Sequence, residues 1–203
     1  MSSFHLPLLL YISLSFYLNH ILTLNLSTKT STTNSQIIEY DHLLINGDFS
    51  LPEQYGEWGF YKDNEIPGWK IKNTTTIELG NATLYSTNYN NSSLQIIELD
   101  GKESDEISQK FISNKERLCQ LSLKYSGITF RKDSSGLQII FNSQSILEVS
   151  PVNDDLVREF KINVLVLSST NEIILKSLVS SNGYGLTVSE VDIRCPKDSE
   201  GCV

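Results

Sequence analysis

The feature that most constrains this chain is a succession of short, strand-like runs from about residue 37 to residue 194. The runs are rich in β-branched and aromatic residues, and most are bounded by Gly, Asn, Asp, Ser or Pro, which is typical of strands separated by turns. Strands are expected at residues 37–45, 69–71, 75–79, 94–99, 106–112, 118–126, 137–141, 145–149, 158–167, 172–179 and 184–194. Because no window carries a convincing helical stripe, the sequence predicts an all-β protein.

Two of the longest runs alternate with a period of two residues. In residues 118–125, the side chains of Cys119, Leu121, Leu123 and Tyr125 fall on one face, and polar side chains fall on the other. Residues 159–166 alternate in the same way. About ten such strands in one chain of this size predict a single β-sandwich domain, with a core large enough for stability.

The first 24 residues contain no Lys, Arg, Asp or Glu and are largely apolar, which predicts a secretory signal peptide. A signal anchor is the alternative, since a membrane span needs roughly 20 apolar residues. Asn19 and His20 interrupt the stretch, so cleavage is favoured, and no membrane span is expected after cleavage. The expected organisation is a signal peptide (1–24), a flexible polar lead-in (25–36), a sandwich domain (37–195) and a C-terminal tail (196–203).

Two further features agree with a secreted or cell-surface protein. Candidate N-glycosylation sites occur at Asn25, Asn73, Asn81, Asn90 and Asn91, although a chain rich in Asn and Ser also makes such triplets by chance. The three cysteines, Cys119, Cys195 and Cys202, suit one disulfide and one leftover thiol, as in an oxidising compartment.

Composition and motifs exclude several functions. With 24 acidic and 16 basic side chains the net charge is −8, which argues against a nucleic-acid binder. Of three histidines, only His42 lies beyond the expected leader, where it is interpreted as a surface or sheet-edge residue. A single histidine excludes a multi-His zinc site and leaves one candidate for a catalytic triad.

The chain also lacks a G-x-S-x-G elbow, a CxxC pair and a phosphate-binding glycine loop, so no cofactor is expected. Paired carboxylates of the glycosidase type remain formally possible. Glu98, Asp100 and the Asp154–Asp155 pair are nevertheless interpreted as solvated surface, and no catalytic residue is assigned.

A series of landmarks in a fixed order resembles a known group of domains. The landmarks are Asn46-Gly-Asp-Phe49, Ile66-Pro-Gly-Trp69, Thr76-Ile-Glu-Leu79, Leu94-Gln-Ile-Ile-Glu-Leu99, Ile107-Ser-Gln-Lys-Phe111, Cys119-Gln-Leu-Ser-Leu-Lys-Tyr125 and Tyr184-Gly-Leu-Thr-Val-Ser-Glu-Val-Asp-Ile193. Together they resemble the galactose-binding-like jelly-roll domains of secreted "choice-of-anchor", plant cell-wall and carbohydrate-binding-module proteins. The resemblance covers roughly residues 40–195 and implies a jelly-roll β-sandwich of two antiparallel sheets.

The landmarks have physical roles of their own. Asn46-Gly47 and Pro67-Gly68 are expected to form turns. Phe49 and Trp69 are expected to pack into the core. Gln109 is expected to satisfy backbone groups at a sheet edge rather than to bind a ligand.

One departure from the resembled domains concerns a metal. Many of them hold a structural calcium ion with carboxylates at positions that correspond here to Ser50 and Ser189. Because calcium affinity depends on charged oxygen ligands, no tight calcium site is expected there, although Asp48, Glu190 and Asp192 lie nearby in the sequence.

The resemblance also implies a disulfide pairing. In a jelly roll the last strand commonly lies beside the strand corresponding to residues 118–126, which favours a bridge between Cys119 and Cys195. The rival is a short local bridge between Cys195 and Cys202.

Ligand-binding candidates lie in the aromatic run of residues 55–61. Tyr55, Trp58 and Tyr61 recur at every third residue in a glycine-containing segment, with Glu57, Lys62 and Asp63 nearby to bind hydroxyl groups. The alternative is that Trp58 and Phe60 pack against the sandwich. A second candidate surface is residues 85–89.

The sequence thus predicts a secreted, non-enzymatic module that binds carbohydrate or a glycoprotein on a cell surface, wall or matrix. The alternative is a structural or adhesive component that binds protein partners.

Overall fold

A computed structural model describes residues 39–54, 58–89, 93–99, 105–128, 135–152, 154–178 and 184–197. The elements are β1 (Tyr40–His42), β2 (Trp58–Lys62), β3 (Lys70–Lys72), β4 (Thr76–Asn81), α2 (Ala82–Tyr85), β5 (Gln95–Leu99), β6 (Glu106–Ile112), β7 (Arg117–Ser126), β8 (Leu137–Phe141), β9 (Gln144–Val149), β10 (Arg158–Val166), β11 (Thr170–Ser177) and β12 (Leu186–Pro196). Within the described ranges, no helix is long and apolar enough to cross a membrane.

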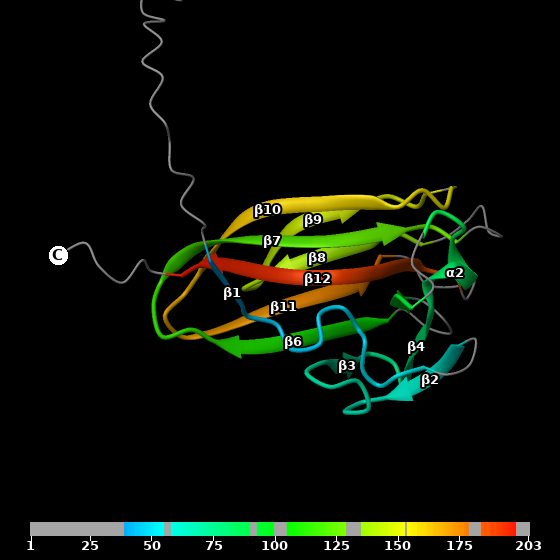
Figure 1. Ribbon diagram of the computed structural model, residues 1–203, viewed down its shortest axis with the longest axis horizontal. Coiled ribbons are helices and arrows are strands. Elements are labelled where there is room, and N and C mark those ends of the chain that lie inside the picture. Colours follow the sequence, from blue (N-terminus) through cyan, green and yellow to red (C-terminus); the bar gives the residue numbers. More distant parts are fainter. Residues whose placement is uncertain are drawn as a thin grey trace, which may run out of the picture. The chain divides into compact units, whose positions relative to one another are not determined.

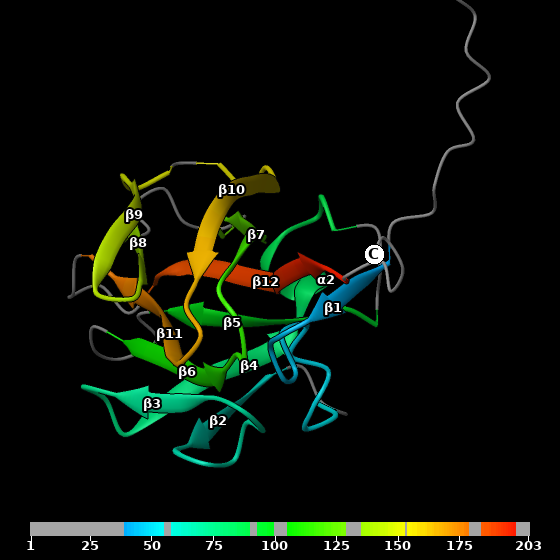
Figure 2. The ribbon, with the colours of Figure 1, turned by 90° about the vertical axis from the view of Figure 1, so that its left-hand side faces the viewer.

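The strands form two antiparallel sheets that pack face to face (Figures 1 and 2). The seven-stranded sheet has the order β10-β7-β12-β5-β4-β2, with β1 added along β12, and the five-stranded sheet has the order β3-β6-β11-β8-β9. This architecture confirms the prediction of an all-β jelly-roll sandwich. The expected leader, lead-in and C-terminal residues 198–203 lie outside the described residues.

The core lies between the sheets and is built from the alternating strand residues. On β7, Cys119, Leu121 and Leu123 are buried, while the neighbours between them face outward. Antiparallel pairing with β10 sets Cys119 opposite Val164, which is also buried. The period-two pattern of the sequence therefore reports the inner face of the sheet correctly.

The predicted turn and core landmarks are confirmed. Asn46 and Gly68 have φ angles of 51° and 84°, the left-handed conformation that Asn and Gly tolerate in turns. Phe49 and Trp69 are buried with ring centroids 5.3 Å apart. The indole Nε1 of Trp69 donates a hydrogen bond to the Asn46 carbonyl oxygen at 3.0 Å, so the two turns are fastened together.

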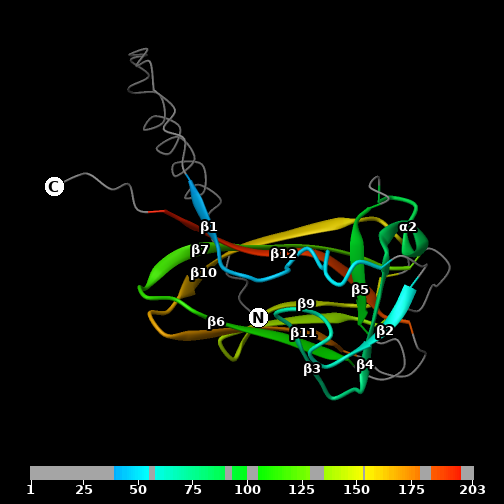
Figure 3. The same cartoon turned by 60° about the horizontal axis from the view of Figure 1, so that its bottom comes forward.

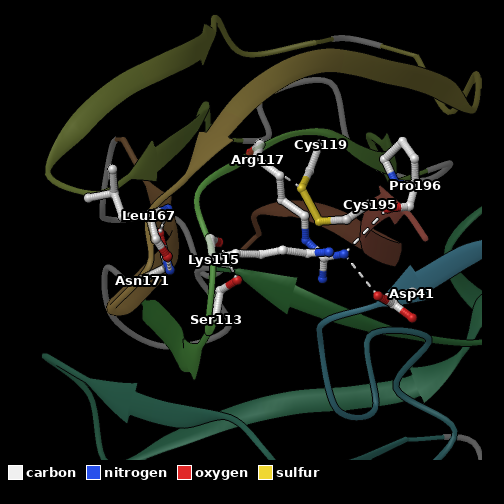
Figure 4. Close-up of a disulfide and its surroundings, with 9 residues drawn as sticks. All are labelled: Asp41, Ser113, Lys115, Arg117, Cys119, Leu167, Asn171, Cys195 and Pro196. Carbon is white, nitrogen blue, oxygen red and sulfur yellow. Dashed lines mark hydrogen bonds and ion pairs between the residues drawn. A yellow bond between two sulfur atoms is a disulfide. The ribbon is translucent and has the colours of Figure 1, made fainter. Parts of the chain in front are cut away.

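A disulfide joins Cys119 of β7 to Cys195 of β12, with the Cα atoms 4.4 Å apart (Figure 4). This is the pairing that the resemblance implied, whereas Cys202 lies outside the described residues. Beside it, Arg117 donates hydrogen bonds to the Asp41 carboxylate at 2.9 Å and to the Pro196 carbonyl at 3.4 Å. The bridge and this cation together connect β1, β7 and β12 at one end of the sandwich.

Two elements were not predicted. Residues 58–62 were read as part of a loop but form β2, and residues 82–85 form the short helix α2. Figure 3 shows α2 beside β4 and β5, with β2 at the margin of the sheet.

Candidate functional site

The exposed aromatic side chains of β2 form the candidate binding surface. Trp58 and Phe60 are 50% and 37% exposed, and their rings meet edge to face with centroids 5.1 Å apart. Lys62 alternates onto the same side and is also exposed. Because β2 ends the seven-stranded sheet and pairs only with β4, this aromatic ledge (Trp58, Phe60 and Lys62) lies open at an edge.

The predicted partners of Trp58 are placed differently from what their spacing suggested. Tyr61 points to the opposite side of β2, packs against the main core and donates a hydrogen bond to Gln54. Burial, reinforced by the Glu65 carboxylate, raises the pKa of Tyr61. A three-residue spacing puts side chains on opposite faces of a strand, so Phe60 rather than Tyr61 accompanies Trp58. Tyr55 and Glu57 lie outside the described residues.

A second hydrophobic cluster covers the outer face of the seven-stranded sheet next to the ledge. It consists of Ala82, Tyr85, Tyr89, Ile96 and Ile128. On β5, Ile97 points to the main core and Ile96 to this cluster, which places the two clusters on opposite faces. Tyr85 and Tyr89 are buried, so residues 85–89 do not present the exposed aromatic surface that the sequence suggested.

Two glutamates face each other beneath this cluster. Glu78 of β4 is in register with Glu98 of β5, and the Tyr85 hydroxyl donates a hydrogen bond to Glu78. The backbone N–H of Gly185 donates to Glu98 at 2.9 Å. Glu98 is 3% exposed, which corrects its interpretation as solvated surface.

Burial is the main influence on this pair and raises the pKa of Glu78. Hydrogen bonds from Tyr85 and Glu98 act in the opposite direction, and the Asp105 carboxylate adds to the rise. Burial and the carboxyl of Glu78 also raise the pKa of Tyr85. Carboxyls that share a hydrogen bond are much closer than the ~5 Å or more between the catalytic carboxyls of glycosidases, so this pair does not fit that chemistry.

A polar groove of about 510 Å³ crosses the same sheet further along, between β1, β12, β7 and β10. Its charged lining residues are His42, Asp48, Lys124, Glu159, Glu190, Asp192 and Arg194. Asp192 pairs with His42 and with Arg194, both at 3.0 Å, and Lys124 pairs with Glu190. His42 is exposed, as expected, and its ring is engaged by Asp192 alone among the described side chains.

The residues of the expected calcium position do not fit that ion. Ser50 donates its hydroxyl to Asp48 at 3.0 Å, and Ser189 is buried with its hydroxyl 3.5 Å from that of Tyr89. Glu190 and Asp192 are already paired with cationic side chains. Across the described ranges, no three His, Cys, Asp or Glu side chains are grouped so as to hold a metal.

The described glycosylation candidates both lie at the ends of short elements. Asn73 is exposed in the turn before β4, and its amide donates to Glu106 at 3.0 Å. Asn81 caps α2, accepting a hydrogen bond from the Thr83 backbone N–H at 3.0 Å. Asn25, Asn90 and Asn91 lie outside the described residues.

Comparisons with known proteins give a likeness of fold only. No family model and no curated protein matches the chain. A family 35 carbohydrate-binding module from Clostridium thermocellum is 14% identical, with a TM-score of 0.42 over 68% of this chain and 98% of that one. The corresponding module of Cellvibrio japonicus Abf62 is 9% identical, with a TM-score of 0.42 over 78% and 95%.

A bacteriophage CBA120 tailspike domain is 13% identical, with a TM-score of 0.45 over 75% of this chain and 21% of that one. The two antiparallel sheets and the ordered landmarks give the class. The chain has a galactose-binding-like jelly-roll fold. Every site residue described above is assigned from this jelly roll's own geometry.

Proposed function

We propose that this chain is a non-enzymatic module that binds carbohydrate outside the cell. The observation that carries the proposal is the pair of half-exposed aromatic rings, Trp58 and Phe60, at the open edge of the sandwich. Exposing two large aromatic side chains to water is unfavourable for a protein unless the surface has a ligand. Sugar rings present C–H faces that pack against such aromatic surfaces, while polar groups fix their orientation.

The polar part of the surface is supplied by Lys62, which is exposed on the ledge side of β2. Its ammonium group donates up to three hydrogen bonds to hydroxyl oxygens. Asp63, the other predicted polar partner, is occupied by the turn that follows, because it accepts a hydrogen bond from the Ile71 backbone N–H at 3.0 Å. The ledge therefore combines two aromatic rings with one mobile cation.

Further features support the compartment and the absence of catalysis. A disulfide between two buried strands suits an oxidising environment, in agreement with the apolar leader sequence. His42 is held by Asp192 alone, with no nucleophile bonded to its ring in the described structure. The closest carboxyl pair, Glu78 and Glu98, is covered by Tyr85 and is not open to a substrate.

A protein partner is the second candidate, and a separate surface favours it. Leu118 and Leu165 face each other in register on the outer side of β7 and β10 and are 61% and 49% exposed. This aliphatic pair has no stacking geometry to offer a sugar. A structural or adhesive role would therefore use a different side of the module.

The test is a glycan array with the secreted protein, followed by affinity measurements on any sugar that binds. We expect Trp58→Ala to weaken binding by at least about tenfold, since it removes a stacking surface. Tyr40→Ala is the matched control, because Tyr40 is also an exposed aromatic residue of an added strand but lies on β1. If Trp58→Ala leaves the affinity unchanged, or both variants lose it equally, the ledge is not the site.

A further inference from the structure

We infer that the Glu78–Glu98 pair and Tyr85 form a proton-operated latch that holds Trp58 in place, so that glycan binding is tighter in acid. This inference rests on the proposed function and adds a regulation of the same surface. It concerns groups that the ledge itself does not use.

The first step is the geometry of the carboxyl pair. Glu78 and Glu98 are register partners on adjacent strands, so both side chains rise from the same face of the sheet. Tyr85 of α2 covers them and donates its hydroxyl proton to Glu78, while Gly185 holds Glu98 from the far side. The two groups are thus confined in a closed space with fixed partners.

The second step is the charge that this space tolerates. Two carboxylates in contact, away from water, cannot both ionise without strong repulsion, so one proton is shared between them. The titratable groups around the pair are Tyr85 from α2, Asp105 ahead of β6, and Tyr184 ahead of β12. On the β2 side, Glu78 is opposite Phe60, which carries no charge. Each titratable neighbour is an acid or a phenol, so further ionisation raises the electrostatic energy.

The third step connects the latch to the ledge through Gly80. Gly80 is the register partner of Trp58. A Cβ atom at Gly80 would lie 2.8 Å from both Cε2 and Oη of Tyr85 and 3.0 Å from Cβ of Trp58. Tyr85 and Trp58 therefore meet over the bare backbone of Gly80, and the docked Tyr85 ring supports the base of the Trp58 side chain.

The fourth step is how weakly the cover is otherwise held. Helix α2 has four residues and is capped by Asn81. The residues after it are fastened chiefly by Asp155, which accepts hydrogen bonds from Ser86, Thr87 and Asn88. Such a short helix has little stability of its own, so its docking depends on these contacts and on the proton-sharing pair.

The sign of the effect follows from these steps. In acid the pair keeps a proton, Tyr85 stays docked and Trp58 is supported. As the pH rises and the last proton leaves, repulsion and the entry of water displace Tyr85. Trp58 then loses its support, and the sugar must pay for ordering the side chain on binding.

The direct experiment follows Trp58 fluorescence in the full secreted chain between about pH 4 and pH 9, without any sugar. The chain has two tryptophans, so the component absent from Trp58→Phe belongs to Trp58. We expect a reversible change in Trp58 emission that disappears in Glu98→Gln. The amide keeps the shape of Glu98 and replaces the shared proton with a permanent N–H donor. Glu148→Gln is the matched control, since Glu148 is an exposed strand glutamate of the other sheet.

A second variant protects the test against a folding failure. Tyr85→Phe keeps the ring but removes the hydrogen bond that lowers the pKa of Glu78, so the midpoint should move to higher pH. A pH-independent Trp58 signal in the wild-type chain, or a transition that persists unchanged in Glu98→Gln, would overturn the latch.

Sugar affinity is measured separately, at one pH on each side of the transition. We expect about a tenfold loss on the alkaline side in the wild-type chain and none in Glu98→Gln. A fluorescence transition without any sugar binding would refute the proposed function and leave the conformational latch standing. Sugar binding with equal affinity at both pH values would refute the regulation and leave the function standing.

Discussion

Gln109 forms hydrogen bonds from both ends of its side-chain amide to the backbone of one residue, Ile45. Its Oε1 accepts from the Ile45 N–H at 2.7 Å, and its Nε2 donates to the Ile45 carbonyl at 2.9 Å. Gln109 lies on β6 of the five-stranded sheet, whereas Ile45 follows β1 of the other sheet. A single buried amide therefore ties the segment after β1 to the opposite layer, in the structural role that the sequence predicted.

We expect Gln109→Leu to lower the free energy of unfolding by about 1–3 kcal/mol, because it leaves two backbone groups of Ile45 without their partner. Denaturant unfolding monitored by fluorescence measures this change. Gln144→Leu, at an exposed position of β9, should change stability by less than about 0.5 kcal/mol. Equal losses in both variants would show that the amide has no special role.

Removing the bridge should destabilise the domain strongly. The sequence separation of Cys119 and Cys195 is 76 residues, and the chain-entropy model assigns about 4 kcal/mol to a loop of that length. We expect Cys119→Ala with Cys195→Ala to unfold at a much lower denaturant concentration and to become insensitive to reductant. Peptide mapping without reduction checks the pairing, and a Cys195–Cys202 peptide would contradict it.

Gly47 tolerates no side chain, because the 46–49 turn lies directly on the backbone of β12. A Cβ atom there would fall 2.0 Å from the Val191 carbonyl oxygen, and backbone cannot move aside as a side chain can. We expect Gly47→Ala to cost about 1–3 kcal/mol. Gly59→Ala should cost much less, since its nearest neighbours at 3.2 Å and 3.3 Å are the mobile side chains of Tyr61 and Gln54. A comparison of the two melting temperatures tests this contrast.

The buried glutamate pair should also make global stability depend on pH. The folded state raises the pKa of Glu78 above its ordinary value of 4.5, so the unfolded chain gives up its proton first. The stability present in acid is therefore lost as the pH rises from about 4.5 through the raised pKa. Chemical unfolding across this range should show the decline in the wild-type chain and a smaller decline in Glu78→Gln. An identical pH profile in both would rule out Glu78 as its source.

Local patterns predicted most of the strands because each strand carries its own alternation. The bounds of β6 and β8 were predicted without error, since both are apolar-alternating runs enclosed by polar residues. The strand β2 was missed because Gly59 and the flanking turn residues resemble a loop. Its extended form is imposed by pairing with β4, and that information is not present in five residues.

The burial of Glu98 could not be read from neighbours in the sequence, because its cover comes from α2 and from Gly185. One signal was available. Ile96 precedes Glu98 on the same face of β5, and an apolar residue there indicates that this outer face is covered. The same reasoning explains why Trp58 and Phe60 emerge as a pair only after the register with β4 is known.

The adjacency of β1 and β12 has a mechanical consequence. Tyr40 is opposite Pro196, and the Lys197 N–H donates to the Glu39 carbonyl at 2.9 Å, so both flanks of the domain enter and leave at one point. A tensile load applied through those flanks would unzip this short ladder bond by bond. The load would then reach Cys195, where a covalent link to the middle of the sheet stops the tear before the core is exposed.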